Sequence, residues 1–224
     1  MVRRAGRRVY ALKSVRIVFS KTGSIKYVSH LDLVRAMTRA VRRADIPLWY
    51  TEGFNKHPYL TFAAPLSLGY EGLRETMDIR MADDFPYDEL VKRLNAVLPE
   101  GLVALSAADA VAKAGELTAA EYRLTIHLPE TVIADALSRT ELLVEKRTKK
   151  KTMKTMDILP YFKNATVEKA GEEVTVVTVA LPSGSNENIN PGLFITALKK
   201  ILGADVDAEV LRLRLLLADG SEFL

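Results

Sequence analysis

The chain has 224 residues, 48% of them hydrophobic and 27% charged, a composition typical of globular proteins that form one large domain or two smaller ones. It contains no cysteine, which excludes disulfides, thiolate zinc sites, cysteine nucleophiles and any iron–sulfur cluster ligated by this chain. No apolar stretch reaches the length of a signal peptide or a membrane span, so we expect a cytoplasmic protein without a membrane partner.

The net charge of +4 is distributed unevenly along the chain. Residues 1–43 hold twelve Lys or Arg against the single acid Asp32, and KRTKKKTMK at 146–154 adds six basic residues without an acid. The rest of the chain is therefore net acidic. This arrangement is typical of a surface that faces a polyanion, although a basic tail and a solvated hairpin tip would give the same pattern.

The first half of the chain alternates between strand and helix patterns. In order, these patterns predict a strand at 14–20, a helix from 29 to 46, two strands within 59–81, a helix from 87 and a strand at 102–108. The order strand, helix, strand, strand, helix, strand is the ferredoxin-like split βαβ pattern.

The second half repeats this order after a linker-like segment at 109–119. Its patterns predict a strand at 121–128, a helix around 131–139, a long basic hairpin between 141–147 and 172–181, a helix from 191 and a last strand that presents Arg212 and Arg214 together. We therefore expect an α+β fold of tandem ferredoxin-like (βαββαβ) domains with antiparallel sheets. The domains would be residues 1–110, with a basic arm, and 119–224, with a basic hairpin.

The helix predicted from residue 29 combines a clear start with a basic face. Ser29 is a good N-cap with Asp32 three residues later, and Leu31, Val34, Met37 and Val41 recur at helical spacing up to Pro47. Arg35, Arg39 and Arg43 are four residues apart, with Arg42 beside them. No acid lies between Asp32 and Asp45, the stretch that holds all four arginines, which favours a face that contacts phosphates.

Three short motifs follow one another in this region: SHLD at 29–32, RRA at 42–44 and GFNKHP at 53–58. Together they resemble the N-terminal signature of the radical-SAM-linked protein family, a bacterial group without a settled activity. Its members occur beside radical-SAM enzymes or as their C-terminal extension, which implies a partner enzyme encoded nearby. The family's loop usually reads GFNPHP, and Lys56 replaces that proline here. The tandem organisation also looks similar, at fold level, to the CRISPR repeat-processing RAMP endoribonucleases, which process RNA without metals.

His30 is the first candidate for chemistry. It falls at the first helical position after Ser29, where free backbone amides and the helix dipole favour an anion and a neutral imidazole. With Tyr27 just before it, His30 could act as a base or contact a phosphate. The alternative is that His30 and Asp32 simply support the start of the helix.

His57 is the second candidate, in a loop with Trp49, Tyr50 and Phe54 on its N-terminal side and Lys56 beside it. Loop aromatics next to basic groups can stack on bases while the lysine meets a phosphate. Alternatively, Trp49 and Phe54 belong to the core and the loop is only a stiff turn. Both interpretations stay open at this point.

From these features we expect an RNA-binding accessory protein that presents RNA, either tRNA or rRNA, to a partner radical-SAM enzyme. It would need no cofactor or metal and have no catalytic activity of its own. The predicted nucleic-acid-binding residues are Arg35, Arg39, Arg42, Arg43, Lys56, His57, Lys146, Arg147, Lys149, Lys150, Lys151 and Lys154. One alternative is a metal-independent endoribonuclease that uses His30 or His57 with Tyr27 and a lysine, and another is a protein-interaction module that docks the radical-SAM enzyme.

Overall fold

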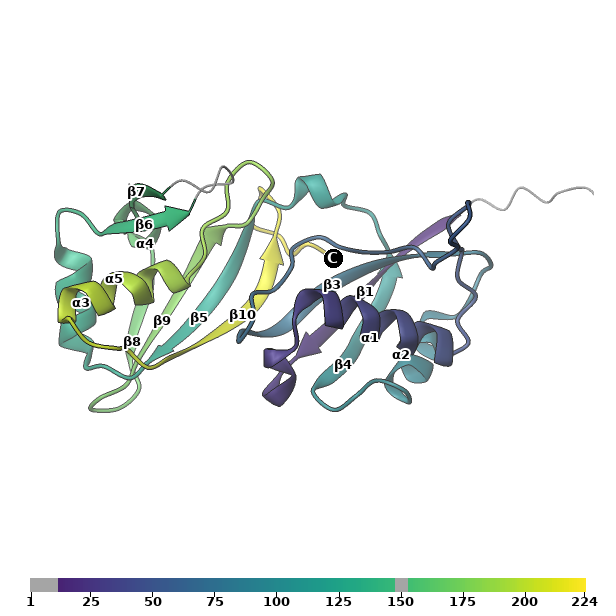
Figure 1. Ribbon diagram of the computed structural model, residues 1–224, viewed down its shortest axis with the longest axis horizontal. Helices are drawn as coiled ribbons and strands as arrows, with labels where there is room; N and C mark the ends of the chain where they lie inside the picture. Colours follow the sequence, from purple (N-terminus) through teal and green to yellow (C-terminus); the bar gives the residue numbers. More distant parts are fainter. Residues whose placement is uncertain (1–11, 148–152) are drawn as a thin grey trace, which may run out of the picture.

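The computed structural model describes residues 12–147 and 153–224, which build a mixed α+β fold on one large, mostly antiparallel sheet (Figure 1). The strands are β1 (Lys13–Lys21), β2 (Leu60–Phe62), β3 (Glu71–Met81), β4 (Leu102–Asp109), β5 (Ala119–Ile126), β6 (Leu143–Arg147), β7 (Met153–Asp157), β8 (Thr166–Lys169), β9 (Thr175–Pro182) and β10 (Ala208–Leu216). The α-helices are α1 (His30–Arg43), α2 (Tyr87–Asn95), α3 (Glu130–Ser138), α4 (Leu159–Phe162) and α5 (Gly192–Leu202), and two 3₁₀ helices are η1 (Gly23–Tyr27) and η2 (Ala114–Glu116). The expected α+β class is confirmed. Within the described ranges, no helix has the length and apolar character needed to cross a membrane.

The large sheet runs in the order β4-β1-β3-β10-β5-β9-β8, and β2 pairs with β3 beside this path. All of its strand pairs are antiparallel except β3 with β10, which are parallel and join the two halves of the chain into one sheet. Figure 1 shows α1 and α5 in front of the sheet, on the same face. Each half keeps its own hydrophobic core between this face and its helices.

The predicted middle hairpin of the second half is wrong. Strands β6 and β7 pair with each other in a separate two-stranded sheet, and the strand at 175–182 pairs instead with β8, which the sequence analysis missed. The composition of this segment gives a physical reason for the separate sheet. Leu142 and Val144 are buried and anchor the β6–β7 hairpin, whereas its basic side chains would lose their hydration without gaining partners if the hairpin were covered by helices as part of the large sheet.

Helix α1 begins as expected and ends slightly earlier. Ser29 caps it by accepting a hydrogen bond from the Asp32 backbone amide, with 3.2 Å between N and Oγ. The helix ends at Arg43 because Asp45 adopts a left-handed conformation (φ 51°), before Pro47 is reached. Leu31, expected on the apolar face, is instead 67% exposed, and the buried residues are Leu33, Met37, Ala40 and Val41.

The join between the halves contains a buried ion pair. Arg212 of β10 donates to Glu75 of β3 through Nε at 2.8 Å and through Nη2, and Nη2 also donates to the Ala64 carbonyl at 2.6 Å. The two charged side chains are 2% and 5% exposed. The expectation that Arg212 and Arg214 would be presented together is therefore wrong, because a register shift separates them and Arg214 pairs with Glu121.

Candidate nucleic-acid interface

The outward side of α1 holds the four arginines predicted from the sequence, and all four are exposed. Arg35 is neutralised by its own helix, since Nη1 lies 2.8 Å from Asp32 Oδ1. Arg43 donates to the Val97 carbonyl at 2.7 Å, and no carboxylate of the described residues lies within 4.0 Å of the side-chain nitrogens of Arg39, Arg42 or Arg43. Three guanidinium groups on one helix therefore keep their full charge toward solvent.

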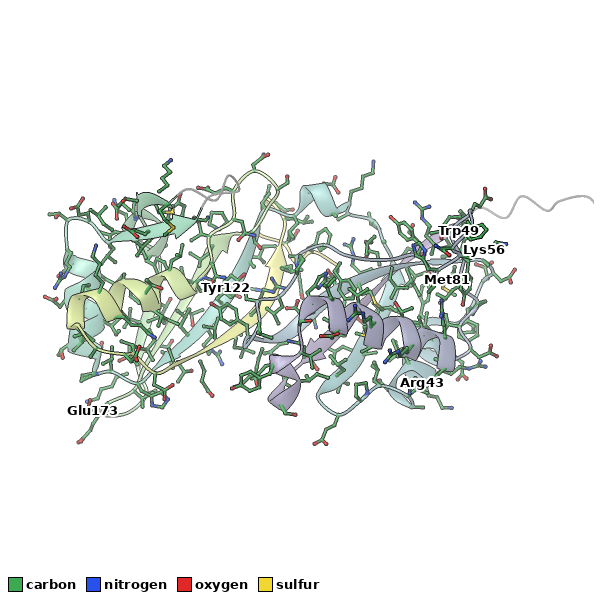
Figure 2. The ribbon with its side chains drawn as sticks, in the orientation of Figure 1. Arg43, Trp49, Lys56, Met81, Tyr122 and Glu173 are labelled. Carbon is green, nitrogen blue, oxygen red and sulfur yellow. The ribbon has the colours of Figure 1, made fainter. Side chains whose placement is uncertain are left out.

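A hairpin formed by residues 49–59 lies beside the C-terminal part of α1. Its neck is fixed to β3, because Trp49 N donates to the Arg80 carbonyl at 2.8 Å and Arg80 N donates to the Tyr59 carbonyl at 3.4 Å. The Arg80 guanidinium lies 4.2 Å from the centre of the Tyr59 ring and 5.5 Å from the Trp49 ring. Such cation–π contacts hold the neck in place. Figure 2 shows Trp49, Lys56 and Arg43 at the same end of the molecule.

The 49–59 hairpin and α1 are in contact through Arg42, whose guanidinium lies 5.8 Å from the centre of the Tyr50 ring. Tyr50 is also exposed and pairs with Pro58 across the hairpin. This contact places a cation of α1 beside an aromatic ring of the hairpin, so the two elements adjoin at the surface. We call this surface, formed by Arg39, Arg42, Arg43 and the 49–59 hairpin, the arginine–hairpin face.

The tip of the hairpin carries a phenylalanine that no part of the chain covers. Phe54 is fully exposed, so its expected alternative place in the core is wrong, whereas Trp49 is half-buried at the neck. Lys56 and His57 are exposed beside it. The structure thus exposes Phe54, Lys56 and His57 within four residues at the tip of a hairpin that adjoins Arg42 through Tyr50.

The two candidate histidines lie at opposite ends of α1. His30 is its first residue and lies edge-on to Phe62, with 5.3 Å between ring centres. His57 lies near the C-terminal end, because its neighbour Pro58 pairs with Tyr50, and Tyr50 contacts Arg42 in the last turns of the helix. A helix of 14 residues is about 20 Å long. The two histidines therefore cannot share one reaction centre.

The surroundings of His30 are partly apolar. Its Nδ1 is buried and has no hydrogen-bond partner among the described residues, and burial lowers the pKa of the ring. Tyr27, the nearest predicted partner, is 68% exposed at the end of η1. His30 thus lies at a helix start where burial favours the uncharged form of its ring, and Tyr27 is largely exposed to solvent.

The second basic segment is separated from the arginine–hairpin face. Figure 1 shows β6 and β7 at the opposite end of the molecule from α1. Lys146 donates from Nζ to the Asn188 carbonyl at 2.6 Å, Lys154 is exposed, and Arg147 is the last residue of β6. The predictions for Lys149, Lys150 and Lys151, and for the basic arm at 1–11, fall outside the described residues. The described parts of the two basic segments therefore do not form one continuous patch.

Part of the N-terminal positive charge does not face solvent at all. Arg16 and Lys21 are each about 1% exposed. Arg16 pairs with Asp78 through Nε and Nη2 at 2.7 and 2.8 Å and stacks on Phe223, whereas Lys21 donates to the Lys26 carbonyl at 3.0 Å. Sequence counts alone could not separate such buried cations from the exposed ones.

Arg80 is the functional candidate that the sequence analysis missed. It lies in β3, and the strand's sequence alone does not indicate that the rings of Trp49 and Tyr59 lie next to it. The one available signal was the pair Trp49 and Tyr59 on either side of a glycine-containing loop, which is typical of a hairpin neck.

Taken together, the fold and this face define an α+β protein with a basic, aromatic surface at one end. Residues 14–191 match the model of a family described as "Uncharacterized protein conserved in bacteria (DUF2344)", and the chain belongs to that family. A search of curated proteins found no match.

Two solved structures match this chain, and one of them is similar at fold level. A chain of the "Crystal Structure of a Cbf5-Nop10-Gar1 Complex" is 14% identical with a TM-score of 0.51, and the alignment covers 90% of this chain and 48% of that one. This protein therefore spans about half the length of the chain it matches, and the likeness concerns the fold alone. The "Crystal Structure of an Unknown Protein from Galdieria sulphuraria" is 13% identical over 90% of this chain and 98% of that chain, with a TM-score of 0.27.

Proposed function

We propose that this protein binds RNA in the cytoplasm through the arginine–hairpin face and presents it, as tRNA or rRNA, to a partner radical-SAM enzyme. The observation that supports this most is the set of three exposed guanidinium groups, on Arg39, Arg42 and Arg43, that no described carboxylate neutralises. Arginine binds phosphate oxygens with paired donors, and nearby aromatic rings add stacking surface for bases.

The partner in this proposal rests on the SHLD, RRA and GFNKHP motifs. A chain without cysteine cannot ligate the iron–sulfur cluster of a radical-SAM enzyme, so the partner would supply the chemistry and this protein the RNA. Copurification of the two proteins from cells, with and without nuclease, tests whether they associate directly or through RNA.

The RNA-binding experiment compares two double variants. Arg39→Ala with Arg42→Ala removes two charges from the proposed face, and Lys163→Ala with Lys169→Ala removes two exposed charges from the second half. Each lost phosphate contact should reduce the slope of log K against log salt by about 0.7 to 0.9. We expect the arginine variant to reduce the slope by about 1.5 and the lysine variant to leave it unchanged. Equal behaviour of both variants would place the RNA elsewhere, and no binding of cellular RNA by the native protein would refute the proposal.

We also propose that both halves, residues 1–110 and 119–224, are ferredoxin-like units. The strand order β4-β1-β3-β2 in the first half supports this, as does the order β10-β5-β9-β8 in the second. In this interpretation β6, β7 and α4 are an insertion between α3 and β8. Expression of the two segments separately, followed by thermal unfolding, tests whether either folds alone.

A metal-independent ribonuclease remains the second candidate, and the observation that favours it is the partly buried His30 at the start of α1, whose pKa is lowered by burial. Because His57 lies at the other end of the helix, His30 would have to act with Tyr27 and a lysine. Cleavage of a structured RNA in EDTA that disappears in His30→Ala would support it. Cleavage that persists in this variant would remove His30 from the scheme.

A protein-docking role is favoured by a different observation. Tyr27, Leu31 and Leu68 are each more than 60% exposed, and η1 is linked to the loop that holds Leu68 by the bond from Gly69 N to the Lys26 carbonyl. The test is a pull-down of the radical-SAM partner on nuclease-treated beads with the double variant Leu31→Ser and Leu68→Ser. If this variant loses the partner but still binds RNA, these exposed apolar residues are the docking site.

A further inference from the structure

The contacts of His57 determine which of its ring nitrogens faces the ligand. Nδ1 lies 3.1 Å from the Asn55 carbonyl oxygen and 3.2 Å from Thr51 Oγ1. A carbonyl oxygen only accepts hydrogen bonds, so the proton of the neutral ring belongs on Nδ1. Nε2 is then left with a free lone pair on an exposed side chain, and no described residue hydrogen-bonds to it.

The same contacts hold the tip in one shape. Thr51 N donates to the His57 carbonyl at 2.9 Å, and His57 N donates to Thr51 Oγ1 at 3.3 Å. Gly53 has φ 129°, a conformation that side-chain-bearing residues avoid, and it lets the chain turn directly before Phe54. A pre-formed tip loses little conformational entropy when a ligand binds.

Three complementary groups therefore project from the tip within four residues. Phe54 offers an uncovered aromatic ring, Lys56 a cation and His57 a hydrogen-bond acceptor at Nε2. A duplex buries its base faces by stacking and uses its Watson–Crick edges for pairing, so it can satisfy only the cation. An unpaired nucleotide can satisfy all three at once.

We propose that the hairpin tip binds one unpaired nucleotide of the RNA, whose base stacks on Phe54 and donates an N–H from its free Watson–Crick edge to His57 Nε2. This rests on the proposed function and narrows its substrate class to RNA with a bulged or looped-out nucleotide next to a stem. The stem backbone then contacts Arg39 and Arg42 of the same face, and the phosphate of the unpaired nucleotide contacts Lys56.

The test uses three RNA stems of the same sequence at one salt concentration. The first carries a single bulged adenosine, the second a bulged purine riboside that lacks only the exocyclic amino group, and the third no bulge. The native protein should prefer the bulged adenosine over the plain stem by about tenfold, as one stacked base contributes. It should prefer adenosine over purine riboside by about fivefold, as one hydrogen bond contributes.

Two variants separate the contributions. His57→Asn keeps an amide N–H that can reach the Asn55 carbonyl but has no acceptor at the Nε2 position, so the fivefold preference should vanish while the tip stays folded. Phe54→Ala should lose most of the tenfold preference and still bind the plain stem. Val111→Ala, which removes an exposed apolar side chain outside the hairpin, is the matched control and should change neither ratio.

The outcomes distinguish this inference from the proposed function. If the native protein binds the plain stem as tightly as the bulged one, or Phe54→Ala keeps the preference, the tip does not bind an unpaired nucleotide even though RNA binding stands. If none of the RNAs binds, the proposed function itself is wrong. Arg39→Ala with Arg42→Ala should weaken all three RNAs by the same factor, because those side chains contact only backbone.

Discussion

The buried pair of Arg212 and Glu75 gives the sharpest stability prediction. Glu75→Gln keeps the shape of the side chain but removes its charge, and it leaves two buried cations, since Lys21 also lies near Glu75 and is 1% exposed. Burial by itself lowers the pKa of Arg212, but the charge and hydrogen bonds of Glu75 raise it above its ordinary value. Arg212 therefore cannot relieve the loss of Glu75 by releasing its proton.

The magnitude follows from burial. Removing one partner of a buried ion pair costs about 3–5 kcal/mol, because the remaining charge stays in a poorly solvated site. Arg212→Met should cost less, about 1–3 kcal/mol, because Lys21 still compensates the Glu75 carboxylate. The double variant should be less destabilised than the sum of the two single variants, since it removes both members of the pair.

Urea unfolding, followed by circular dichroism with midpoint and slope fitted separately, measures these free energies. If Glu75→Gln fails to fold, the free energy of unfolding of Arg212→Met is measured instead. A cost below about 1 kcal/mol for Glu75→Gln, or a larger cost for Arg212→Met than for Glu75→Gln, would refute the reasoning that Lys21 and Arg212 share one counter-charge.

Three further predictions use the same assay. Gly72→Ala should destabilise by about 1–3 kcal/mol, because a Cβ there would overlap the Glu75 side chain, whereas Gly171→Ala meets Val174 only at 3.6 Å and should be nearly neutral. Ser29→Ala should cost about 1 kcal/mol through loss of the α1 cap, and Ser29→Thr should cost less; equal costs would contradict the capping role. Burial lowers the pKa of His30 below its ordinary 6.5, so the unfolded chain binds that proton more tightly, and the free energy of unfolding should fall as pH drops below about 6.5. His30→Phe should lose this part of the pH dependence, and an unchanged dependence would show that His30 does not cause it.

Elements with local signals could be predicted from the sequence. The cap at Ser29 and the spacing of Met37 and Val41 located α1, and the exposed arginines of this helix follow from the same period. Leu31 was misassigned because it lies two residues before the buried Leu33, which is about 200° around the helix, so its side chain faces away from the core and toward solvent.

Features that depend on contacts distant in sequence could not be predicted. The pairs of Arg212 with Glu75 and Arg16 with Asp78 join residues that are 137 and 62 positions apart. Strand β8 has four residues, mostly exposed, and its sequence TVEK gives no periodic signal. In the candidate site, the loop aromatics were visible in the sequence, but the contact of Arg80 with Trp49 and Tyr59 required the hairpin to fold back on β3.

The buried and exposed cations have different consequences for binding. Arg16 and Lys21 are enclosed, so the surface of the first half is less basic than its sequence, and long-range attraction of any polyanion would depend on fewer charges. The backbone that carries the remaining charges of α1 is instead held in place, because the helix packs on the core through Met37 and Val41 while the hairpin is tied to β3 through Trp49. A fixed backbone sets the spacing of the Cα atoms that carry the cations before any ligand binds, although each arginine side chain still loses rotamer freedom on binding. Under the proposed function, such a face would favour a folded RNA with defined geometry over a flexible polyanion.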